Sequence, residues 1–467
     1  MENDTQYKET DMVNVTVRDI LKATGGELLS GNEDTELLDI CTDSRKIKAG
    51  DLFVPLLGEK VDSHIFIDKA MEVGAATLTS EHDGIVESDK AYIRVDNTRD
   101  ALQDIGLYIR KRYDDMPYIG VTGSVGKTTT REMITAAIST SKRCFHTKEN
   151  RNSQVGVPVT LSELDKGYEA AVIEMGISEP GEMERLSRMV MPSICVVTII
   201  GVAHIEHMGS KENIRNEKLK IASHMKEGGI MLLNGDDPLL NEVKGRIDYK
   251  TITFGCGEEN DFRATDIVAK QGHTYFKCLH DGESVDVCLA TMGRHNVRNA
   301  LAAIAVAYLL GIPMEVASEG FKDFYGIRQR VLKLEGRYTI IDDAYNASPD
   351  SMRAAIDVLC DYKCEGRKIA VLGDMFELGE NSRKYHRELG EYIRDKKIDE
   401  VVVVGKDSME IKKAIDECPD SYCKAYSFSD NEEVSIYLMA IMKPEDVVLI
   451  KGSNGMKLNE VVNILMN

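Results

Sequence analysis

The sequence predicts an α/β protein with three domains, and three observations support this. An apolar strand at 118–122 breaks into a glycine-rich turn that opens a helix. Further apolar strands alternate with helical stretches on both sides of it. The 467 residues, 43% of them hydrophobic, suffice for about three domains. We expect a small N-terminal α/β domain at 1–112, a central P-loop-type parallel-sheet ATPase domain at 113–322, and a C-terminal Rossmann-like doubly wound domain at 323–467.

Short strands and helices alternate through the N-terminal domain. Residues 15–21 predict a strand that runs into a short helix, which Gly25-Gly26 ends. Residues 50–56 predict a turn that leads into a strand, and 67–73 predict a helix. The loop with Ser44 and Arg45 could hold a diphosphate, although the residues alone favour a solvated polar loop.

The turn at 120–128 reads Gly-Val-Thr-Gly-Ser-Val-Gly-Lys-Thr. Its glycines let backbone N–H groups approach phosphate oxygens, Lys127 adds a positive charge, and Thr128 offers a hydroxyl to Mg²⁺. The pattern therefore predicts a nucleotide-phosphate site, with an ordinary glycine turn as the alternative. The residues expected to contact ATP are Thr122, Gly123, Ser124, Val125, Gly126, Lys127, Thr128 and Thr129.

Two more strands of the central domain end in side chains that can bind a metal. Strand 170–173 is followed by Glu174, and strand 194–200 by His204. Because the carboxyl ends of parallel strands meet at one sheet edge, both are expected near the phosphates. The alternatives are a structural acid and a core or surface histidine. Lys218 lies on a polar helical stretch, where a lysine is normally solvated.

An Ala-rich helix begins with Asn296 and Asn299 one turn apart on one face. Such amides suit recognition of a base or ribose, or helix capping. In the C-terminal domain, four apolar runs alternate with helices and predict a second doubly wound sheet; they occupy 338–341, 368–372, 401–404 and 447–450. No Gly-x-Gly-x-x-Gly follows the first of them, which argues against nicotinamide binding.

Composition and charge exclude other classes. The chain has 58 basic and 78 acidic residues, a net charge of −20, so its surface repels nucleic acid and anionic membranes. Residues 1–12 are polar and acidic, unlike a signal peptide, and the apolar run 194–202 is too short to span a membrane. The 10 cysteines lack zinc-site spacing and are expected to be reduced. A cytoplasmic protein without nucleic-acid binding or membrane insertion is expected.

Together these residues resemble the Mur ligases, ATP-dependent enzymes that append amino acids to UDP-N-acetylmuramic acid. The resemblance covers nearly the whole chain. Residues 120–128 match the family's Gly-x-x-Gly-x-x-Gly-Lys-Thr, and 295–300 match its His-Asn-x-x-Asn-Ala. Residues 150–158 are similar to its asparagine-rich loop, with departures at Ser153 and Gln154. Asp43-Ser44-Arg45 resembles its uridine-diphosphate-sugar domain, which reverses the preference for a solvated loop.

The resemblance implies two Mg²⁺ ions in addition to ATP. Thr128 and Glu174 would serve the first ion, and His204 and Lys218 the second, with Lys127 completing the catalytic set. Lys218 aligns with the family's carbamylated lysine, whose carbamate is an anionic ligand where an ammonium would be repelled. The family often has Glu two residues further on, where this chain has Lys220.

Within the family, 342–352 and 370–379 are similar to members that add D-alanyl-D-alanine to UDP-N-acetylmuramoyl-tripeptide. These two molecules are the expected substrates of an enzyme expected to be monomeric. The contacts implied are Ser44, Arg45 and Asn152 for the UDP-substrate, Asn296, Arg330 and Asp343 for the ATP base and ribose, and Tyr345 and Asn346 for the dipeptide.

In the mechanism implied, ATP phosphorylates the substrate carboxylate and an amine attacks the acyl phosphate. Domain closure would complete the site and exclude water. One alternative is another ligase of this superfamily, such as the sibling that adds the third amino acid. That sibling has Tyr-Ala-His-Thr-Pro where this chain has 345–349. The other alternative is a P-loop ATPase switch, disfavoured by the missing Asp-rich Walker B strand and by the sugar-type N-terminal domain.

Overall fold

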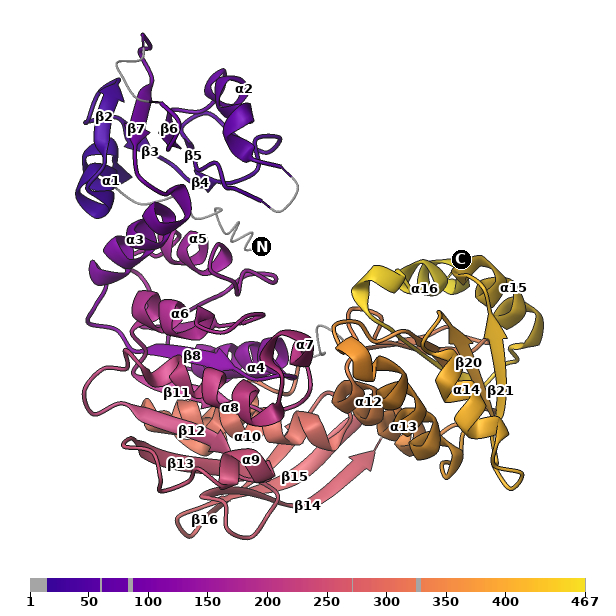
Figure 1. The fold of residues 1–467 in the computed structure, drawn as a ribbon. Coiled ribbons are helices and arrows are strands. Elements are labelled where there is room, and N and C mark those ends of the chain that lie inside the picture. The colour runs from indigo at the N-terminus through magenta and orange to yellow at the C-terminus, as the bar shows by residue number, and fades with distance from the viewer. Residues whose placement is uncertain (1–14, 59–60, 83–86, 271, 325–328, 467) are drawn as a thin grey trace, which may run out of the picture.

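The computed structural model describes residues 15–58, 61–82, 87–270, 272–324 and 329–466. Figure 1 shows an L-shaped molecule, with the N-terminal part above the central part and the C-terminal part beside it. Each large sheet lies within one of the three ranges expected from the sequence. The chain is therefore α/β throughout, as predicted, while the exact domain limits stay a prediction.

The N-terminal sheet has the order β2-β7-β6-β5-β4 in the described residues, and β1 pairs with β3 beside it. Helix α1 ends at Gly25, whose φ of 66° favours glycine, so the predicted stop is confirmed. The elements are β1 (Val15–Thr16), α1 (Val17–Thr24), β2 (Glu27–Ser30), β3 (Glu36–Leu37), β4 (Ile40–Cys41), β5 (Leu52–Phe53), η1 (Ser63–Phe66), α2 (Ile67–Met71), β6 (Ala76–Thr79), β7 (Ala91–Arg94) and α3 (Thr98–Lys111).

The central sheet has the order β16-β15-β14-β13-β12-β11-β8-β10-β9 in the part of the chain that is described. Its parallel core is buried on both faces, and alternate residues of β8 enter different apolar clusters. Tyr118 belongs to the cluster of α6, and Ile119 to that of α4 and α10. The core elements are β8 (Tyr118–Thr122), α4 (Lys127–Ser139), β9 (Cys144–His146), α5 (Gly156–Ser162), β10 (Ala170–Glu174), α6 (Glu182–Val190), β11 (Ile194–Val197), α7 (Ile205–Met208), α8 (Lys211–Leu219), η2 (Lys220–Ala222), β12 (Ile230–Asn234), α9 (Pro238–Asn241), α10 (Arg294–Leu309) and α11 (Met314–Glu319).

The four strands from β13 to β16 of this sheet were not predicted from the sequence. Strands β13 (Lys250–Gly255) and β14 (Phe262–Lys270) continue the parallel part, and β15 (His273–His280) and β16 (Glu283–Leu289) extend it as antiparallel strands. Asp281-Gly282, both with positive φ, form the two-residue turn between β15 and β16. An Asp-Gly turn between alternating strands is a recognised hairpin signal, so the sequence did contain it.

The C-terminal sheet has the order β17-β18-β22-β19-β20-β21 over the described residues. The four predicted strands are confirmed as β18, β19, β20 and β22, whereas the edge strands β17 and β21 were not predicted. The elements are β17 (Arg330–Lys333), β18 (Thr339–Asp342), α12 (Pro349–Asp361), β19 (Lys368–Gly373), η3 (Gly379–Asn381), α13 (Ser382–Arg394), β20 (Glu400–Val404), α14 (Met409–Asp416), β21 (Lys424–Phe428), α15 (Asn431–Ile441), β22 (Val447–Lys451), η4 (Asn454–Met456) and α16 (Asn459–Met466).

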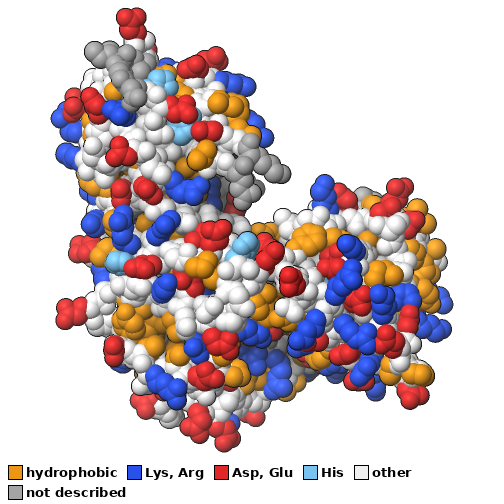
Figure 2. Space-filling model, viewed as in Figure 1, with side chains coloured by type: hydrophobic (Ala, Val, Ile, Leu, Met, Phe, Trp, Pro, Cys, Tyr) orange, Lys and Arg blue, Asp and Glu red, His pale blue; other side chains and the backbone are white. Residues whose placement is uncertain are grey.

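The central part joins its two neighbours differently. It shares one continuous apolar cluster with the N-terminal part, and buried Arg110 of α3 donates to the carbonyl of Val190 at 2.9 Å. The C-terminal core takes in Val202 and Met292 from the central part. Figure 2 shows a hollowed surface on the inner side of the L, with acidic and basic side chains interspersed over this face.

Candidate active site

The phosphate loop joins β8 to α4 and is shaped by contacts within the central part. Gly123 and Gly126 have φ values of 149° and 86°, which favour glycine. A Cβ on Gly123 would lie 1.9 Å from Thr198 Oγ1. That hydroxyl donates to the carbonyl of Val125 at 2.6 Å, and the Ser124 N–H donates to the carbonyl of Ile199 at 2.8 Å. The loop is therefore held against the end of β11 in a conformation suited to phosphate.

Two side chains of the loop are placed for phosphate and metal chemistry. Lys127 Nζ donates to the Gly123 carbonyl at 2.9 Å, across the turn it follows. Thr128 is 5% exposed, and its Oγ1 has no hydrogen-bond partner in the described part of the chain. Because buried hydroxyls are normally satisfied, this orphaned oxygen at the start of α4 fits the Mg²⁺ ligand that the motif calls for.

Glu174 lies at the end of β10 and is fully buried. Its Oε2 accepts from Arg131 Nη1 at 3.2 Å, and its Oε1 accepts from Asn152 Nδ2 at 2.7 Å. Arg131 is one helical turn after Lys127 on α4 and was not singled out from the sequence. A carboxylate beside the phosphate loop suits Mg²⁺, and Arg131 offsets its charge. Asn152, expected to contact the UDP-substrate, is engaged with Glu174.

His204 and Glu377 meet at the border between the central and C-terminal parts. His204 Nδ1 lies 2.7 Å from Glu377 Oε2. The neighbouring imidazole holds the pKa of the Glu377 carboxyl below its usual value. Both residues have left-handed backbone conformations, with φ of 61° and 62°. The expectation that His204 lies near the phosphate loop is met, because both line the same cleft.

Lys218 corrects the expectation of a solvated lysine, since its side chain is only 2% exposed. Burial, together with the nearby Lys127 cation, holds the pKa of its ammonium well below the usual value, which Glu217 partly offsets. Lys220 points elsewhere, because its Nζ lies 2.7 Å from Glu217 Oε2 and its side chain is 43% exposed. Lys220 therefore pairs with Glu217, whereas Lys218 makes no ion pair within the described residues.

The start of α10 braces the phosphate loop. Asn299 accepts from Thr130 Oγ1 at 3.1 Å and donates to Asn296 Oδ1 at 3.3 Å. Asn296 Nδ2 donates to the Met292 carbonyl at 2.7 Å. Burial and the cations Lys451 and Arg298 lower the pKa of the adjacent His295 to about 4, so its ring is neutral at pH 7.

The C-terminal side of the site is organised by Lys451. Its Nζ lies 2.8 Å from Asp343 Oδ2 and donates to the Asn346 carbonyl at 2.9 Å. Asp343, expected to contact the ATP ribose, is thus ion-paired. Arg330, also expected at the nucleotide, is bound to Asp342 Oδ2 at 2.6 Å.

A cleft of about 730 Å³ between the central and C-terminal parts gathers many of these residues. Its size suits a nucleotide. The predicted residues that line it are Ser124, Val125, Gly126, Lys127, Thr128, Thr129, His204, Asn296, Asp343, Tyr345 and Asn346. The predicted residues outside its lining are Ser44, Arg45, Thr122, Gly123, Asn152, Glu174, Lys218 and Arg330.

Three sequence families match the chain in order. Residues 39–108 match the family described as Mur ligase family, catalytic domain; residues 121–307 match Mur ligase middle domain; and residues 328–454 match Mur ligase, glutamate ligase domain. A UDP-N-acetylmuramoyl-tripeptide--D-alanyl-D-alanine ligase of Bacillus subtilis is 37% identical, over 97% of this chain and 99% of that protein. The chain belongs to the Mur ligase family.

Other Mur ligases agree in sequence and in structure. A Synechocystis relative of the same description is 34% identical, over 93% of each chain. The crystal structure of MurF from Acinetobacter baumannii matches with a TM-score of 0.89 at 30% identity, over 97% of this chain and 98% of that one. The structure of MurF ligase from Thermotoga maritima in complex with ADP has a TM-score of 0.80 at 29% identity, over 92% and 97%. The three-domain Mur ligase fold and the ATP-dependent, amide-forming character of the family are therefore shown for this chain.

The N-terminal part of this Mur ligase carries the loop expected at the UDP-substrate. Arg45 is bound to Asp43 at 2.8 Å, and its side chain is 83% exposed. The Arg45 guanidinium lowers the pKa of the Asp43 carboxyl to about 2. Ser44 lies between them, so the loop presents a cation and a hydroxyl on the surface.

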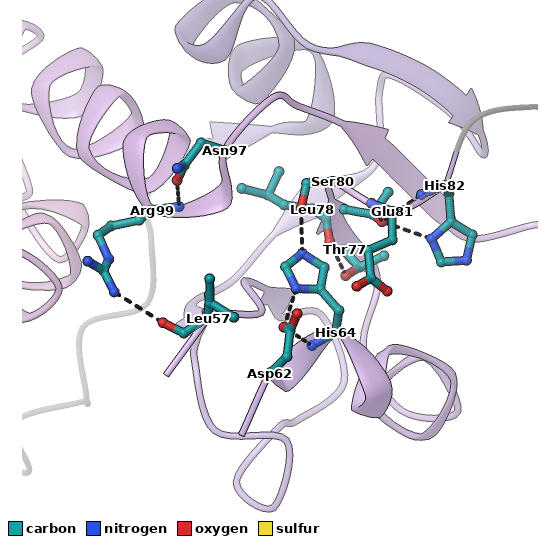
Figure 3. A network of polar contacts seen from close by, with 11 residues as sticks. Leu57, Asp62, His64, Thr77, Leu78, Ser80, Glu81, His82, Asn97 and Arg99 are labelled. Carbon is teal, nitrogen blue, oxygen red and sulfur yellow. Dashed lines mark hydrogen bonds and ion pairs between the residues drawn. The ribbon is translucent and has the colours of Figure 1, made fainter. Parts of the chain in front are cut away.

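A second polar network of the N-terminal part surrounds His64 (Figure 3). His64 Nδ1 lies 2.6 Å from Asp62 Oδ1, and Nε2 lies 3.0 Å from Ser80 Oγ. Together with Glu81, Asp62 and His64 have ligand atoms close enough to hold a metal ion. Because both ring nitrogens already have partners, we interpret the network as a brace between η1 and the end of β6.

Glu377, which lines the Mur ligase cleft, and Arg131, which binds Glu174 beside it, were not assigned from the sequence. Glu377 follows β19 at a strand end, a position that parallel sheets use for ligands. Arg131 shares the α4 face of Lys127. The positions of Glu377 and Arg131 were visible in the sequence. Their partners, His204 and Glu174, lie far away in the sequence. None of the helices in the described residues is long and apolar enough to cross a membrane.

Proposed function

We propose that this Mur ligase adds D-alanyl-D-alanine to UDP-N-acetylmuramoyl-tripeptide through an acyl-phosphate intermediate in peptidoglycan precursor synthesis. One observation supports this most: the phosphate loop, Tyr345 and Asn346 line a single cleft. Those two residues belong to the segment that resembles dipeptide-adding ligases. The relatives named above carry that activity in their descriptions.

The chemistry follows from the nature of the carboxylate. A carboxylate is a poor acyl donor because its leaving group would be an oxide. Transfer of the ATP γ-phosphoryl to one carboxylate oxygen gives a phosphate leaving group, and the dipeptide amine then attacks the acyl carbon, releases phosphate and loses a proton. Lys127 offsets charge on the transferred phosphoryl group, and the cleft between the two domains keeps water from the acyl phosphate.

We propose two Mg²⁺ positions. Thr128, with its orphaned hydroxyl, and Glu174 would hold one ion, and His204 and modified Lys218 the other. When bound, these ions would neutralise phosphate charge and orient the transferred group. The chain's own contribution is rigid placement: Arg131 and Asn152 fix the Glu174 carboxylate.

Lys218 is proposed to be carbamylated. A neutral amine attacks CO₂, forms an N–C bond and loses a proton, which gives an anionic carbamate. Burial, the nearby Lys127 cation and the lowered pKa favour the neutral amine that this step needs. The carbamate would also replace a cation beside Lys127 with an anion. An unmodified lysine that contacts phosphate is the competing account.

The substrate contacts stay as predicted from the resemblance. Ser44, Arg45 and Asn152 are proposed for the UDP-substrate, and Tyr345 and Asn346 for the dipeptide. Asn296 and Asp343 line the cleft and, with Arg330, are proposed for the ATP base and ribose. We also propose domain limits at 112/113 and 322/323, and a monomer that acts in the cytoplasm; light scattering would test the oligomeric state.

The decisive experiment measures amide formation by the purified chain. UDP-muramyl dipeptide and tripeptides with different third residues are paired with D-alanyl-D-alanine, D-alanine and diamino acids. Dependence of ATP turnover on a UDP-muramyl-tripeptide and D-alanyl-D-alanine together is expected. ATP hydrolysis without an acceptor would favour the ATPase switch, and use of the dipeptide substrate with a single amino acid would favour the sibling ligase.

A further inference from the structure

Glu377 reaches from the C-terminal part to a residue of the proposed phosphoryl-transfer site. Its Oε2 lies 2.7 Å from His204 Nδ1. Among the residues that the structure describes, this is the one contact between a carboxylate and a basic side chain that joins the central and C-terminal parts. His204 lines the cleft together with Lys127 and Thr128. Glu377 thus links the docking of the two domains to the surroundings of the proposed metal site.

Both partners adopt a backbone conformation that non-glycine residues rarely use. The φ values are 61° for His204 and 62° for Glu377. Each such conformation costs on the order of 1–3 kcal/mol and persists where the surrounding structure enforces it. Both strained residues meet across a domain border. This indicates that each loop is held in the backbone conformation that the contact requires.

The Glu377 loop is fixed by its own domain. The Met375 N–H donates to His386 Nε2 at 2.9 Å, and the Phe376 N–H donates to Ser453 Oγ at 2.9 Å. On the other side, Val202 of the His204 loop is buried in the C-terminal core cluster, which also contains Leu378. Apolar packing therefore holds the two loops together and places the carboxylate beside the imidazole, although Nδ1 makes no hydrogen bond of good geometry within the described residues.

We propose that Glu377 is a positioning residue for the phosphoryl-transfer site. It holds the Nδ1 side of the His204 ring and leaves Nε2 as the nitrogen available to a metal ion. This inference rests on the proposed function. A carboxylate at the outer nitrogen of a metal-bound histidine fixes the ring, and its loss typically lowers metal affinity by about 10–100-fold. Because Glu377 belongs to the C-terminal domain, the metal site reaches full affinity only when the two domains are docked.

A rival account makes the opposite prediction. If Glu377 competed with the metal for His204, its removal would strengthen metal binding. The sign of the change in affinity therefore separates support from competition. Neither account requires turnover, so binding can be measured without the acceptor substrates.

The test measures Mn²⁺ binding by electron paramagnetic resonance of the free ion, with the full chain and a non-hydrolysable ATP analogue. Glu377→Gln is expected to raise the Mn²⁺ dissociation constant about tenfold, and Glu377→Asp to restore part of the affinity. Glu380→Gln, an equal charge change on an exposed neighbour in η3, is the matched control and should behave like the wild type.

A double-mutant cycle completes the test. In a His204→Ala background, Glu377→Gln should add no further loss, because the residue acts through the imidazole. Equal or tighter Mn²⁺ binding by Glu377→Gln, or an additive loss in the cycle, would overturn the inference. A wild type that binds Mn²⁺ but forms no amide would instead contradict the proposed function.

Discussion

Two lysines of this molecule are equally buried and have opposite surroundings. Lys218 and Lys451 are each 2% exposed. Lys451 lies 2.8 Å from the Asp343 carboxylate and donates to the Asn346 carbonyl. Lys218 has no ion-pair partner in the described part of the chain, and the Lys127 cation contributes to the lowering of its pKa. Burial alone therefore does not distinguish a structural lysine from a chemical one.

The difference shows what each domain does with a buried ammonium. A paired one stabilises the loop that presents Asp343 and Asn346. An unpaired one is costly in its charged form, so Lys218 favours the neutral amine or a modified state. This contrast supports the proposal that Lys218 takes part in chemistry, whereas Lys451 stabilises a loop.

The largest effect on activity is expected at Lys127, the cation that contributes to the lowered pKa of Lys218. Lys127→Ala should lower amide formation by about 10³-fold, because a positive charge in the phosphate loop stabilises the transferred phosphoryl group. Amide hydrogen exchange in β8 and α4 should stay unchanged, since the side chain lines the cleft. Loss of the cation should also raise the pKa of Lys218. A fully active variant would remove the phosphate-loop assignment.

Replacing the unpaired lysine tests the carbamate. Lys218→Ala should reduce activity by about 10²-fold, as loss of a metal ligand does, and short carboxylic acids should restore part of it by occupying the vacated position. Lys220→Ala, which changes an exposed lysine paired with Glu217, should keep nearly full activity. Rescue by amines rather than carboxylates would indicate a cation at 218.

Replacing Lys451 or Lys218 with methionine removes the positive charge but keeps an unbranched side chain. The effect on stability tests the comparison between the two lysines. Lys451→Met removes the buried ammonium that contacts the Asp343 carboxylate and the Asn346 carbonyl and should cost about 3 kcal/mol, whereas Lys218→Met should cost nothing or stabilise the fold. Amide hydrogen exchange in β18, β22 and α8 is the suitable measurement, since a multidomain chain does not unfold in two states. Equal losses of stability in Lys451→Met and Lys218→Met would contradict the proposed difference between the two lysines.

The smallest effect is a dependence of stability on pH in CO₂-free buffer. Burial lowers the folded pKa of Lys218 well below its ordinary value of 10.5, so between the two values the unfolded chain binds more protons. Stability of the wild type relative to Lys218→Met should therefore rise with pH across this window and level off above about 10.5. A flat difference between the two proteins would show that folded Lys218 keeps its proton.

The sequence by itself determined the features of this protein that depend on a few neighbouring residues. Apolar runs bounded by turns predicted β8, β10 and β11 of the central sheet and β18, β19, β20 and β22 of the C-terminal sheet, because side-chain periodicity follows from backbone geometry over a few residues. Gly123, Gly126, Lys127 and Thr128 specified the phosphate loop for the same reason, since their conformations and functional groups lie within one strand-turn-helix unit. The motif order was sufficient to indicate the family.

Only the tertiary structure decided the surroundings of these groups. Lys218 is predicted to be solvated from its polar helix, yet the packing of α8 against the central part removes it from water. Asn152 meets Glu174, and Glu377 meets His204, across loops distant in sequence. Burial and pairing depend on how separate elements and domains pack together, and no short stretch of sequence contains that information.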